Sequence, residues 1–241
     1  MIIESRNLCF SYGKNQVLKG VSFTALEGEI TFLAGENGSG KTTWISNAVS
    51  LLRPSSGEVN YDGRPFEQIR PAVSVAFDTT PLYPYLSVVE NLKVLFDVDA
   101  LQTDKHRFLC DMGMDDELIR KKAGKLSYGQ KHRVGIAGAL LRDQQCYILD
   151  EPDLGLDPAA WKTVKNRIIQ LRKDGKTIVV TGQNYPMLQE FVSRIVVLKD
   201  GIIIYEGTIN EFLDAYGESS RQLRQAFEHL TGIAGGDSDE K

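Results

Sequence analysis

Near its amino end the chain reads Gly35-Glu36-Asn37-Gly38-Ser39-Gly40-Lys41-Thr42-Thr43, which satisfies the pattern G-x-x-x-x-G-K-[ST] in full. This pattern is typical of a loop that wraps the phosphates of a nucleotide. The apolar run from Ile30 to Ala34 precedes it and predicts a strand, and the segment from Trp44 to Val49 follows without Gly or Pro and predicts a helix. Strand, loop and helix are the context that the motif requires, so a chance glycine-rich turn is the weaker interpretation.

Each part of this loop suits a triphosphate. Gly35, Gly38 and Gly40 allow the positive-φ, side-chain-free geometry that such a loop needs in order to turn its backbone N–H groups inward. The helix that follows points its amino end at the anion. Lys41 is expected to reach the β- and γ-phosphates, and the Thr42 hydroxyl suits the octahedral oxygen coordination of Mg²⁺. The loop therefore predicts a site for a nucleotide with Mg²⁺.

The composition is that of an ordinary soluble domain. The chain has 241 residues, of which 42% are hydrophobic and 25% are charged, and its formal net charge is −4. This charge argues against a general nucleic-acid binder, which normally has a basic balance, so we expect no nucleic-acid partner. No apolar run approaches the roughly 20 residues that are needed to span a bilayer. We therefore expect a cytosolic chain, or one that docks on a membrane through another molecule.

Short apolar runs along the chain predict strands, and a long central segment predicts helices. Between Thr79 and about Arg142 the pattern is helical, with amphipathic candidates at Val88 to Phe96 and Asp116 to Lys122. We interpret this segment, about residues 79–142, as a helical insertion in an α/β domain. The predicted strands are Ile2 to Tyr12, Val17 to Phe23, Ile30 to Ala34, a short strand near Val59, Ala72 to Phe77, Cys146 to Leu149, Thr177 to Thr181, Ile195 to Leu198 and Ile202 to Tyr205.

Two acidic residues, Asp150 and Glu151, follow the apolar run Cys146 to Leu149. Ligands collect at the carboxyl ends of parallel strands, so this pair is expected beside the phosphate loop. Asp150 can then hold Mg²⁺, directly or through water, and Glu151 can accept a proton from the attacking water. Two solvated acids at a strand end are the alternative, which the phosphate loop upstream makes weaker.

A second site for an anion is predicted where the segment Lys125 to Arg133 opens a helix. Ser127 can cap this helix and donate its hydroxyl outward, and Gly129 lets a phosphate approach the backbone. A helix-capping motif of this kind is common by itself. Its position between a phosphate loop and an Asp-Glu strand makes it a candidate nucleotide contact.

With these motifs in order, the sequence resembles the ATP-binding subunits of ABC transporters over nearly the whole chain, roughly Met1 to Leu213. Gly35 to Thr43 corresponds to Walker A in that family. Tyr12 falls at the aromatic residue that stacks on adenine, whereas its position alone fits equally well an edge-strand aromatic that covers core. Leu126 to Gln130 corresponds to the signature motif, Ile148 to Glu151 to Walker B and Leu154 to Asp157 to the D-loop. The resemblance implies a P-loop NTPase core of the ABC type with an antiparallel β subdomain and an inserted helical subdomain.

The resemblance also implies a two-chain site. Two chains sandwich two ATP molecules head to tail, and Ser127, Gly129 and Gln130 of one chain cap the γ-phosphate held by the other. The second chain is either an identical copy or a paralogue. The helical subdomain would dock the cytoplasmic helices of an integral membrane permease, so the chain is expected in the cytoplasm, peripheral on the inner face of the cell membrane.

Three residues depart from the family pattern. Tyr128 stands where glycine is usual in the signature. Asp78 replaces the Q-loop glutamine; it could hold Mg²⁺ or water, or it could merely cap the turn at Thr80. Gln183 stands where the switch histidine is usual, and none of the three histidines, His106, His132 and His229, is an obvious substitute. Glutamine can donate to the γ-phosphate but cannot titrate, so we expect ATP binding with slow hydrolysis.

We predict an ATPase subunit that powers a separate permease. The segment Leu82 to Leu92 and the short chain after the last strand look most like two-subunit bacterial exporters, with import as the alternative direction. Two other classes stay open: a soluble ABC-type ATPase clamp, and a slow, regulatory nucleotide-binding protein. The end of the chain, about residues 214–241, is predicted to hold one helix, Arg221 to Leu230, and a mobile acidic tail.

Overall fold

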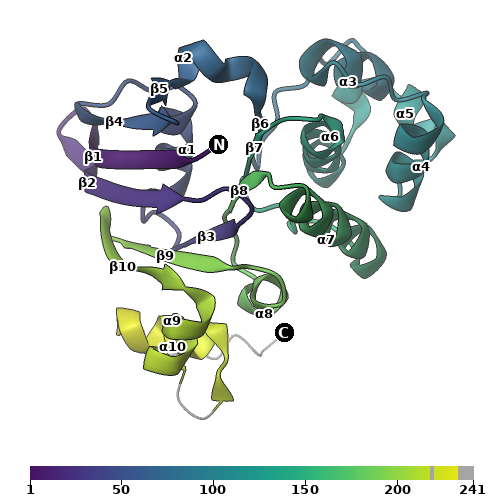
Figure 1. Cartoon of the computed structure of the whole chain (residues 1–241). Helices are drawn as coiled ribbons and strands as arrows, with labels where there is room; N and C mark the ends of the chain where they lie inside the picture. Colours follow the sequence, from purple (N-terminus) through teal and green to yellow (C-terminus); the bar gives the residue numbers. More distant parts are fainter. Residues whose placement is uncertain (218–219, 233–241) are drawn as a thin grey trace.

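The computed structural model describes residues 1–217 and 220–232. It begins with an antiparallel hairpin of strand β1 (Ile3–Tyr12) and strand β2 (Asn15–Ala25). Strand β4 (Ser56–Tyr61) pairs with the other edge of β1, and the short β5 (Arg64–Pro65) pairs with β4. These strands form an antiparallel sheet in the order β2-β1-β4-β5 (Figure 1).

A second sheet has six strands in the order β10-β9-β3-β8-β7-β6. Strands β3, β8, β7 and β6 run parallel, β9 is parallel to β3, and β10 returns antiparallel to β9. Every residue of β3, β7 and β8 is buried, which explains why these strands read as continuous apolar runs. The bounds are β3 (Ile30–Ala34), β6 (Val73–Ala76), β7 (Cys146–Leu149), β8 (Thr177–Val180), β9 (Arg194–Lys199) and β10 (Ile202–Thr208).

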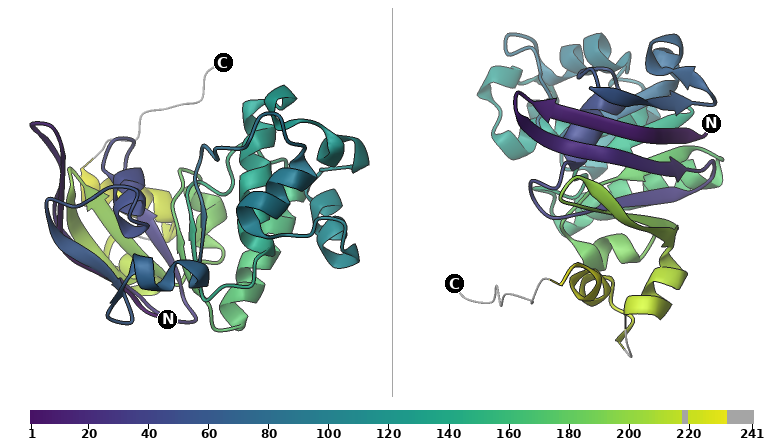
Figure 2. Two further views of the ribbon diagram at one scale, coloured as in Figure 1. Left: turned by 90° about the horizontal axis from the view of Figure 1, so that it is seen from above. Right: turned by 90° about the vertical axis from the view of Figure 1, so that its left-hand side faces the viewer.

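The six-stranded sheet separates two hydrophobic cores. Side chains of β3 alternate between them, because successive residues of a strand point to opposite faces. Phe32 belongs to the core shared with the central helices, whereas Leu33 belongs to the core shared with the antiparallel sheet and Trp44. The left view in Figure 2 shows the helical region on one side of this sheet and the antiparallel sheet on the other.

Helices surround this framework and begin at recognisable caps. Ser87 and Glu90 form a capping box at α3, and Asp157 caps α7, in which Pro158 is the first residue. Across the described residues, each helix is too short or too polar to cross a membrane. The helices are α1 (Lys41–Ala48), α2 (Phe66–Ile69), α3 (Val88–Phe96), α4 (Thr103–Asp111), α5 (Asp116–Arg120), α6 (Tyr128–Leu141), α7 (Pro158–Lys173), α8 (Tyr185–Gln189), α9 (Ile209–Tyr216) and α10 (Leu223–Thr231), with 3₁₀ turns at Arg70–Ala72 and Ala123–Lys125.

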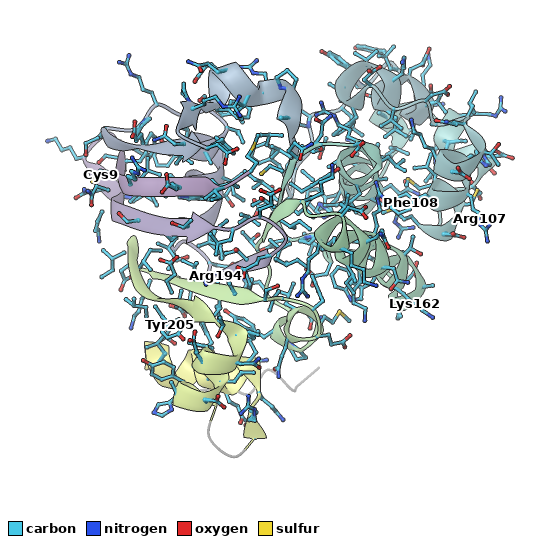
Figure 3. All side chains as sticks on the ribbon, in the orientation of Figure 1. Cys9, Arg107, Phe108, Lys162, Arg194 and Tyr205 are labelled. Atoms are coloured by element: carbon cyan, nitrogen blue, oxygen red, sulfur yellow. The ribbon has the colours of Figure 1, made fainter. Side chains whose placement is uncertain are left out.

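Close packing joins the central helices to each other and the C-terminal helices to β10. A Cβ atom at Gly138 of α6 would lie 2.4 Å from the ring of Phe96, so glycine is what allows α6 to approach α3. At the other end of the molecule Tyr205, labelled in Figure 3, lies beside α9, with its ring centroid 4.8 Å from that of Phe212.

The predicted α/β class with an antiparallel sheet and a helical segment is confirmed. Several local predictions differ in extent: the segment Asp116 to Lys122 is helical only to Arg120, and the C-terminal helix runs from Leu223 to Thr231 instead of Arg221 to Leu230. The helices α2, α8 and α9 were not predicted. The predicted mobile tail falls on residues 233–241, which lie outside the described residues.

Candidate nucleotide-binding site

The loop from Gly35 to Gly40 joins β3 to α1, and its glycines serve different purposes. Gly40, immediately before α1, has a φ of +114°, and a Cβ atom there would lie 2.8 Å from the Leu18 side chain. Gly38 also has a positive φ, +83°. The prediction of a positive φ for Gly35 was wrong. Glycine is required there for space, because a Cβ atom would lie 2.5 Å from the Leu198 carbonyl oxygen.

Lys41 lies inside the loop, with only 6% of its surface exposed. Its ammonium group donates to the carbonyl oxygens of Gly35, at 2.8 Å, and Glu36, at 3.0 Å. Burial lowers the pKa of Lys41, and the negative charges of Glu151 and Asp150 oppose this effect. The loop therefore fixes a cation beside the backbone N–H groups that open α1.

Asp150 is 2% exposed, and a hydroxyl group donates to each of its carboxylate oxygens. The Thr42 hydroxyl lies 3.0 Å from Oδ2, and the Thr181 hydroxyl lies 2.5 Å from Oδ1. Burial raises the pKa of Asp150, and the two hydroxyl donors oppose this effect. Through Asp150 the ends of β7 and β8 are tied to the first turn of α1.

A cavity of about 430 Å³ gathers the phosphate loop and two of the predicted acidic residues. Asp78 enters it from the loop after β6, and Glu151 from the end of β7. The parallel strands thus bring their carboxyl ends to one place, as expected for this sheet type. The lining residues are Val17, Asn37, Gly38, Gly40, Lys41, Thr42, Thr43, Asp78 and Glu151.

The oxygen donors in and beside this cavity fit Mg²⁺. Thr42, Asp150 and Asp78 offer only oxygen atoms, which hard divalent cations prefer. Within residues 1–217 and 220–232, no three His, Cys, Asp or Glu side chains form a group that could hold a metal by themselves. In proteins Mg²⁺ is usually held by one or two carboxylates together with substrate phosphates.

Glu151 has an unusual backbone conformation, with a φ of +48°. Its N–H donates to the Thr181 hydroxyl at 3.0 Å, and its carbonyl oxygen accepts from the Leu154 N–H at 3.0 Å. The same carbonyl lies 3.1 Å from Nε2 of His132. A non-glycine residue with positive φ persists only where surrounding contacts determine it, and such residues cluster at functional sites.

His132 and Thr181 were missed as parts of the site. The sequence placed His132 only in the helical insertion, but the structure buries it against the backbone of Asp78 and Glu151. Burial lowers the pKa of His132, which favours the neutral ring, although the charge of Asp78 opposes this. These contacts join segments far apart in the chain, so spacing in the sequence gives no signal for them.

Gln183 approaches the phosphate loop directly. Its side-chain amide donates to Oδ1 of Asn37 at 3.1 Å. The residue predicted to sense the γ-phosphate therefore touches the loop that is predicted to hold that phosphate. Asn37 also lines the cavity.

The signature residues lie apart from this cavity. Ser127 accepts from the Gln130 N–H at 3.2 Å, and the Gln130 side chain accepts from the Ser127 N–H at 3.0 Å, which makes a capping box at α6. Neither they nor Gly129 line the cavity formed by the phosphate loop of the same chain. Tyr128 is 54% exposed, and its hydroxyl donates to the Asp78 carbonyl oxygen at 3.3 Å.

Tyr12 is also 54% exposed and lies at the end of β1. Its ring meets Phe10 edge to face, with centroids 4.8 Å apart. Tyr12 is not among the residues that line the cavity, although Val17 of the next strand is. Its role in stacking on adenine stays a prediction.

Sequence comparison gives two findings. The family model described as "ABC transporter" matches residues 18–154. The uncharacterized ABC transporter ATP-binding protein YdbJ of Bacillus subtilis (strain 168) is 33% identical over 215 residues, which cover 84% of this chain and 68% of that protein.

Two solved structures are similar over most of the chain. One, described as the ATP binding subunit of an ABC transporter, has a TM-score of 0.85 and 26% identity, and the match covers 96% of this chain and 100% of that one. The other is a dimeric ATP-binding cassette in a post-hydrolysis state, bound to ADP and Pi. Its TM-score is 0.73 with 27% identity, and the match covers 86% of this chain and 98% of that one.

Proposed function

Because the chain belongs to the ABC transporter family and is an ATP-hydrolysing subunit of that family, we propose that it works as half of a two-chain motor that drives a separate integral membrane permease. The observation that supports this most is the cavity in which Lys41, Thr42 and Glu151 converge, while the signature residues of the same chain lie elsewhere. A partner chain must then complete each site.

Residue roles follow from the geometry of that cavity. Lys41 and the N–H groups of the loop, from Gly38 to Thr43, bind the β- and γ-phosphates. Thr42, Asp150 and Asp78 would hold Mg²⁺, which would neutralise charge on the phosphates and orient them. Glu151 accepts the proton of the attacking water, and its fixed backbone directs its carboxylate. Tyr12 stacks on adenine.

The second half of each site comes from the partner ATPase, as an identical copy or a paralogue. Ser127 keeps its hydroxyl hydrogen available while its oxygen caps α6, so it can donate to a phosphate held by the partner. Gly129 and Gln130 lie in the first turn of the same helix, where backbone N–H groups and the helix dipole attract anions.

We expect hydrolysis to be roughly 10- to 1000-fold slower than with a histidine at position 183, because a single polar contact to a transition state commonly contributes a rate factor of this size. Gln183 already donates to Asn37, and its amide cannot take up a proton near neutral pH. Changing Gln183→His should therefore raise turnover with little change in ATP affinity. Equal turnover in both proteins, at the rates of ordinary transporters, would contradict slow hydrolysis.

The membrane partner is proposed to dock beside the helical segment, which would hold the chain on the inner face of the cell membrane. Tyr83, Tyr85, Val94 and Leu101 are large apolar residues that remain exposed there. The resemblance of Leu82 to Leu92 to the exporters supports export as the direction. Purification from detergent-solubilised membranes tests the partner: an integral membrane protein should accompany the wild type and be lost from a Tyr83→Ala, Tyr85→Ala double variant.

The motor itself is tested by Glu151→Gln. We expect turnover to fall by about 10²-fold or more, as for loss of a general base, while an ATP-bound dimer becomes more stable. Glu117→Gln, which changes an exposed acid at the start of α5, is the matched control and should leave the rate unchanged. Turnover that is indifferent to Glu151→Gln would exclude this mechanism.

A further inference from the structure

His132 is a buried side chain that none of these roles uses. It is 1% exposed, although it lies in the second turn of α6. Nδ1 is 2.9 Å from the Asp78 carbonyl oxygen, and Nε2 is 3.1 Å from the Glu151 carbonyl oxygen. Both neighbours are acceptors, so the ring donates to one of them when neutral and to both when protonated. The imidazole ring therefore links the loop after β6 to the residues that follow β7.

The contact with Glu151 falls on a strained peptide. Its φ of +48° is strained for a non-glycine residue, and such a conformation persists only where the surrounding contacts hold it. Thr181 holds the N–H of this residue, and His132 and the Leu154 N–H hold its carbonyl oxygen. The direction of the Glu151 carboxylate follows from this backbone, so His132 is one of the contacts that set it.

The contact with Asp78 is shared with another side chain of α6. The Tyr128 hydroxyl donates to the same Asp78 carbonyl oxygen, at 3.3 Å. The first turns of α6 therefore hold the loop after β6, whose Asp78 side chain lines the same cavity as Glu151. Both acids of the cavity are attached through their backbones to the helix that Ser127 caps.

We propose that His132 is a positioning residue for ATP hydrolysis: by holding the carbonyl groups of Glu151 and Asp78, it aligns their two carboxylates and links that alignment to the helix that meets the partner's nucleotide. This inference rests on the proposed function. It assigns His132 no contact with the nucleotide. Its loss therefore lowers kcat and leaves the affinity for ATP unchanged.

The test compares three substitutions of His132 in steady-state ATPase assays, with ATP affinity and thermal unfolding measured on the same samples. His132→Phe keeps the ring but removes both nitrogens, and kcat should fall about 10-fold or more, since small displacements of catalytic groups cost up to about 10²-fold. His132→Gln places its amide near the position of Nε2 and should restore much of the rate. His132→Asn places its amide near Nδ1, towards Asp78, and should restore less.

Two controls distinguish the positioning role of His132 from an unspecific effect of losing a histidine and from a failure of the proposed function. His106→Phe changes a partly exposed histidine of α4, which pairs with Asp116 away from the cavity, and should leave kcat unchanged. Glu151→Gln shows whether the measured rate depends on the proposed site at all; a rate independent of Glu151 would count against the proposed function. A Glu151-dependent rate that is unchanged in His132→Phe would overturn the positioning role alone. So would equal losses of ATP affinity and kcat in all three His132 variants, since that pattern indicates a structural role only.

Discussion

The phosphate-loop half and the signature half of the proposed ATP site differ in how far one chain completes them. In the first half, Lys41 bonds to two loop carbonyls and Asp150 accepts from two hydroxyls. In the second half, the side chains of Ser127 and Gln130 each accept from the other's backbone N–H across the first turn of α6, and Tyr128 stays exposed although its hydroxyl reaches the Asp78 carbonyl oxygen. The phosphate-loop half is arranged by contacts within the chain, whereas the signature half is a capped helix end that faces outward.

Burial explains this difference. Asp150 and Lys41 are almost fully buried, and buried polar groups must find partners inside the protein. An exposed helix end can leave its N–H groups to water or to an anion that arrives later. Substitutions in the first half should therefore impair a single chain, and substitutions in the second half should impair only the assembled pair.

Asp150→Asn should have the largest effect. The amide supplies one acceptor oxygen in place of two, so one of the hydroxyls of Thr42 and Thr181 loses its acceptor and the Mg²⁺ ligand loses its charge. We expect turnover to fall by about 10²- to 10³-fold. ATP binding by the single chain should also lose its dependence on Mg²⁺. Asp143→Asn, at an exposed acid that pairs with Lys176, is the matched control. Unaltered Mg²⁺-dependent binding would show that the phosphate-loop half does not depend on Asp150.

Ser127→Asp tests the signature half without removing its cap, since Asp also caps helices well. Its negative charge would face the partner's phosphate, so turnover should fall by about 10²-fold. ATP binding by the single chain should stay within about twofold, because Ser127 does not touch the chain's own cavity. Ser127→Ala separates the cap from the contact, and should cost about 1 kcal/mol of stability in urea denaturation. Weaker ATP binding by single chains of Ser127→Asp would contradict the division into halves.

Tyr12→Ala should weaken ATP binding by about 10-fold, because stacking of a base on an aromatic ring contributes roughly 1–3 kcal/mol. Tyr12→Phe keeps the ring and should bind as the wild type does. Fluorescence titration with ATP measures both variants. Equal affinities in all three proteins would mean that Tyr12 only covers Phe10 at the strand end.

Gly138→Ala should have the smallest effect on the site while it destabilises the helical region. The added Cβ atom would meet the Phe96 ring at 2.4 Å, and overpacking of this kind costs about 1–3 kcal/mol. Urea denaturation should detect the loss, and ATP affinity should not change, because α3 does not contribute to the cavity. Unchanged stability would show that α3 moves aside without cost.

The sequence predicts the local parts of the site well and the tertiary contacts poorly. The phosphate loop, the cap at Ser127 and the Asp157-Pro158 helix start depend on residues next to each other, so their spacing reveals them. The positions of His132 and Thr181 depend on how α6 and β8 pack against β7, which no spacing encodes. Gly35 was expected for its backbone angle, but glycine is needed there because the Leu198 carbonyl oxygen leaves no room for a Cβ atom. Leu198 lies on β9, far along the chain, so the sequence around Gly35 does not reveal this contact.

The most direct test of the two-chain site mixes the two damaged halves. For a pair of identical chains, Asp150→Asn and Ser127→Asp should each be nearly inactive alone, but a mixed dimer would contain one site with both changes and one site with neither. An equimolar mixture should therefore recover about a quarter of the wild-type ATPase rate, since about half of random dimers are mixed and each has one intact site. A mixture no more active than its components would contradict the account, because it would mean that the phosphate loop and the signature of one chain serve the same nucleotide.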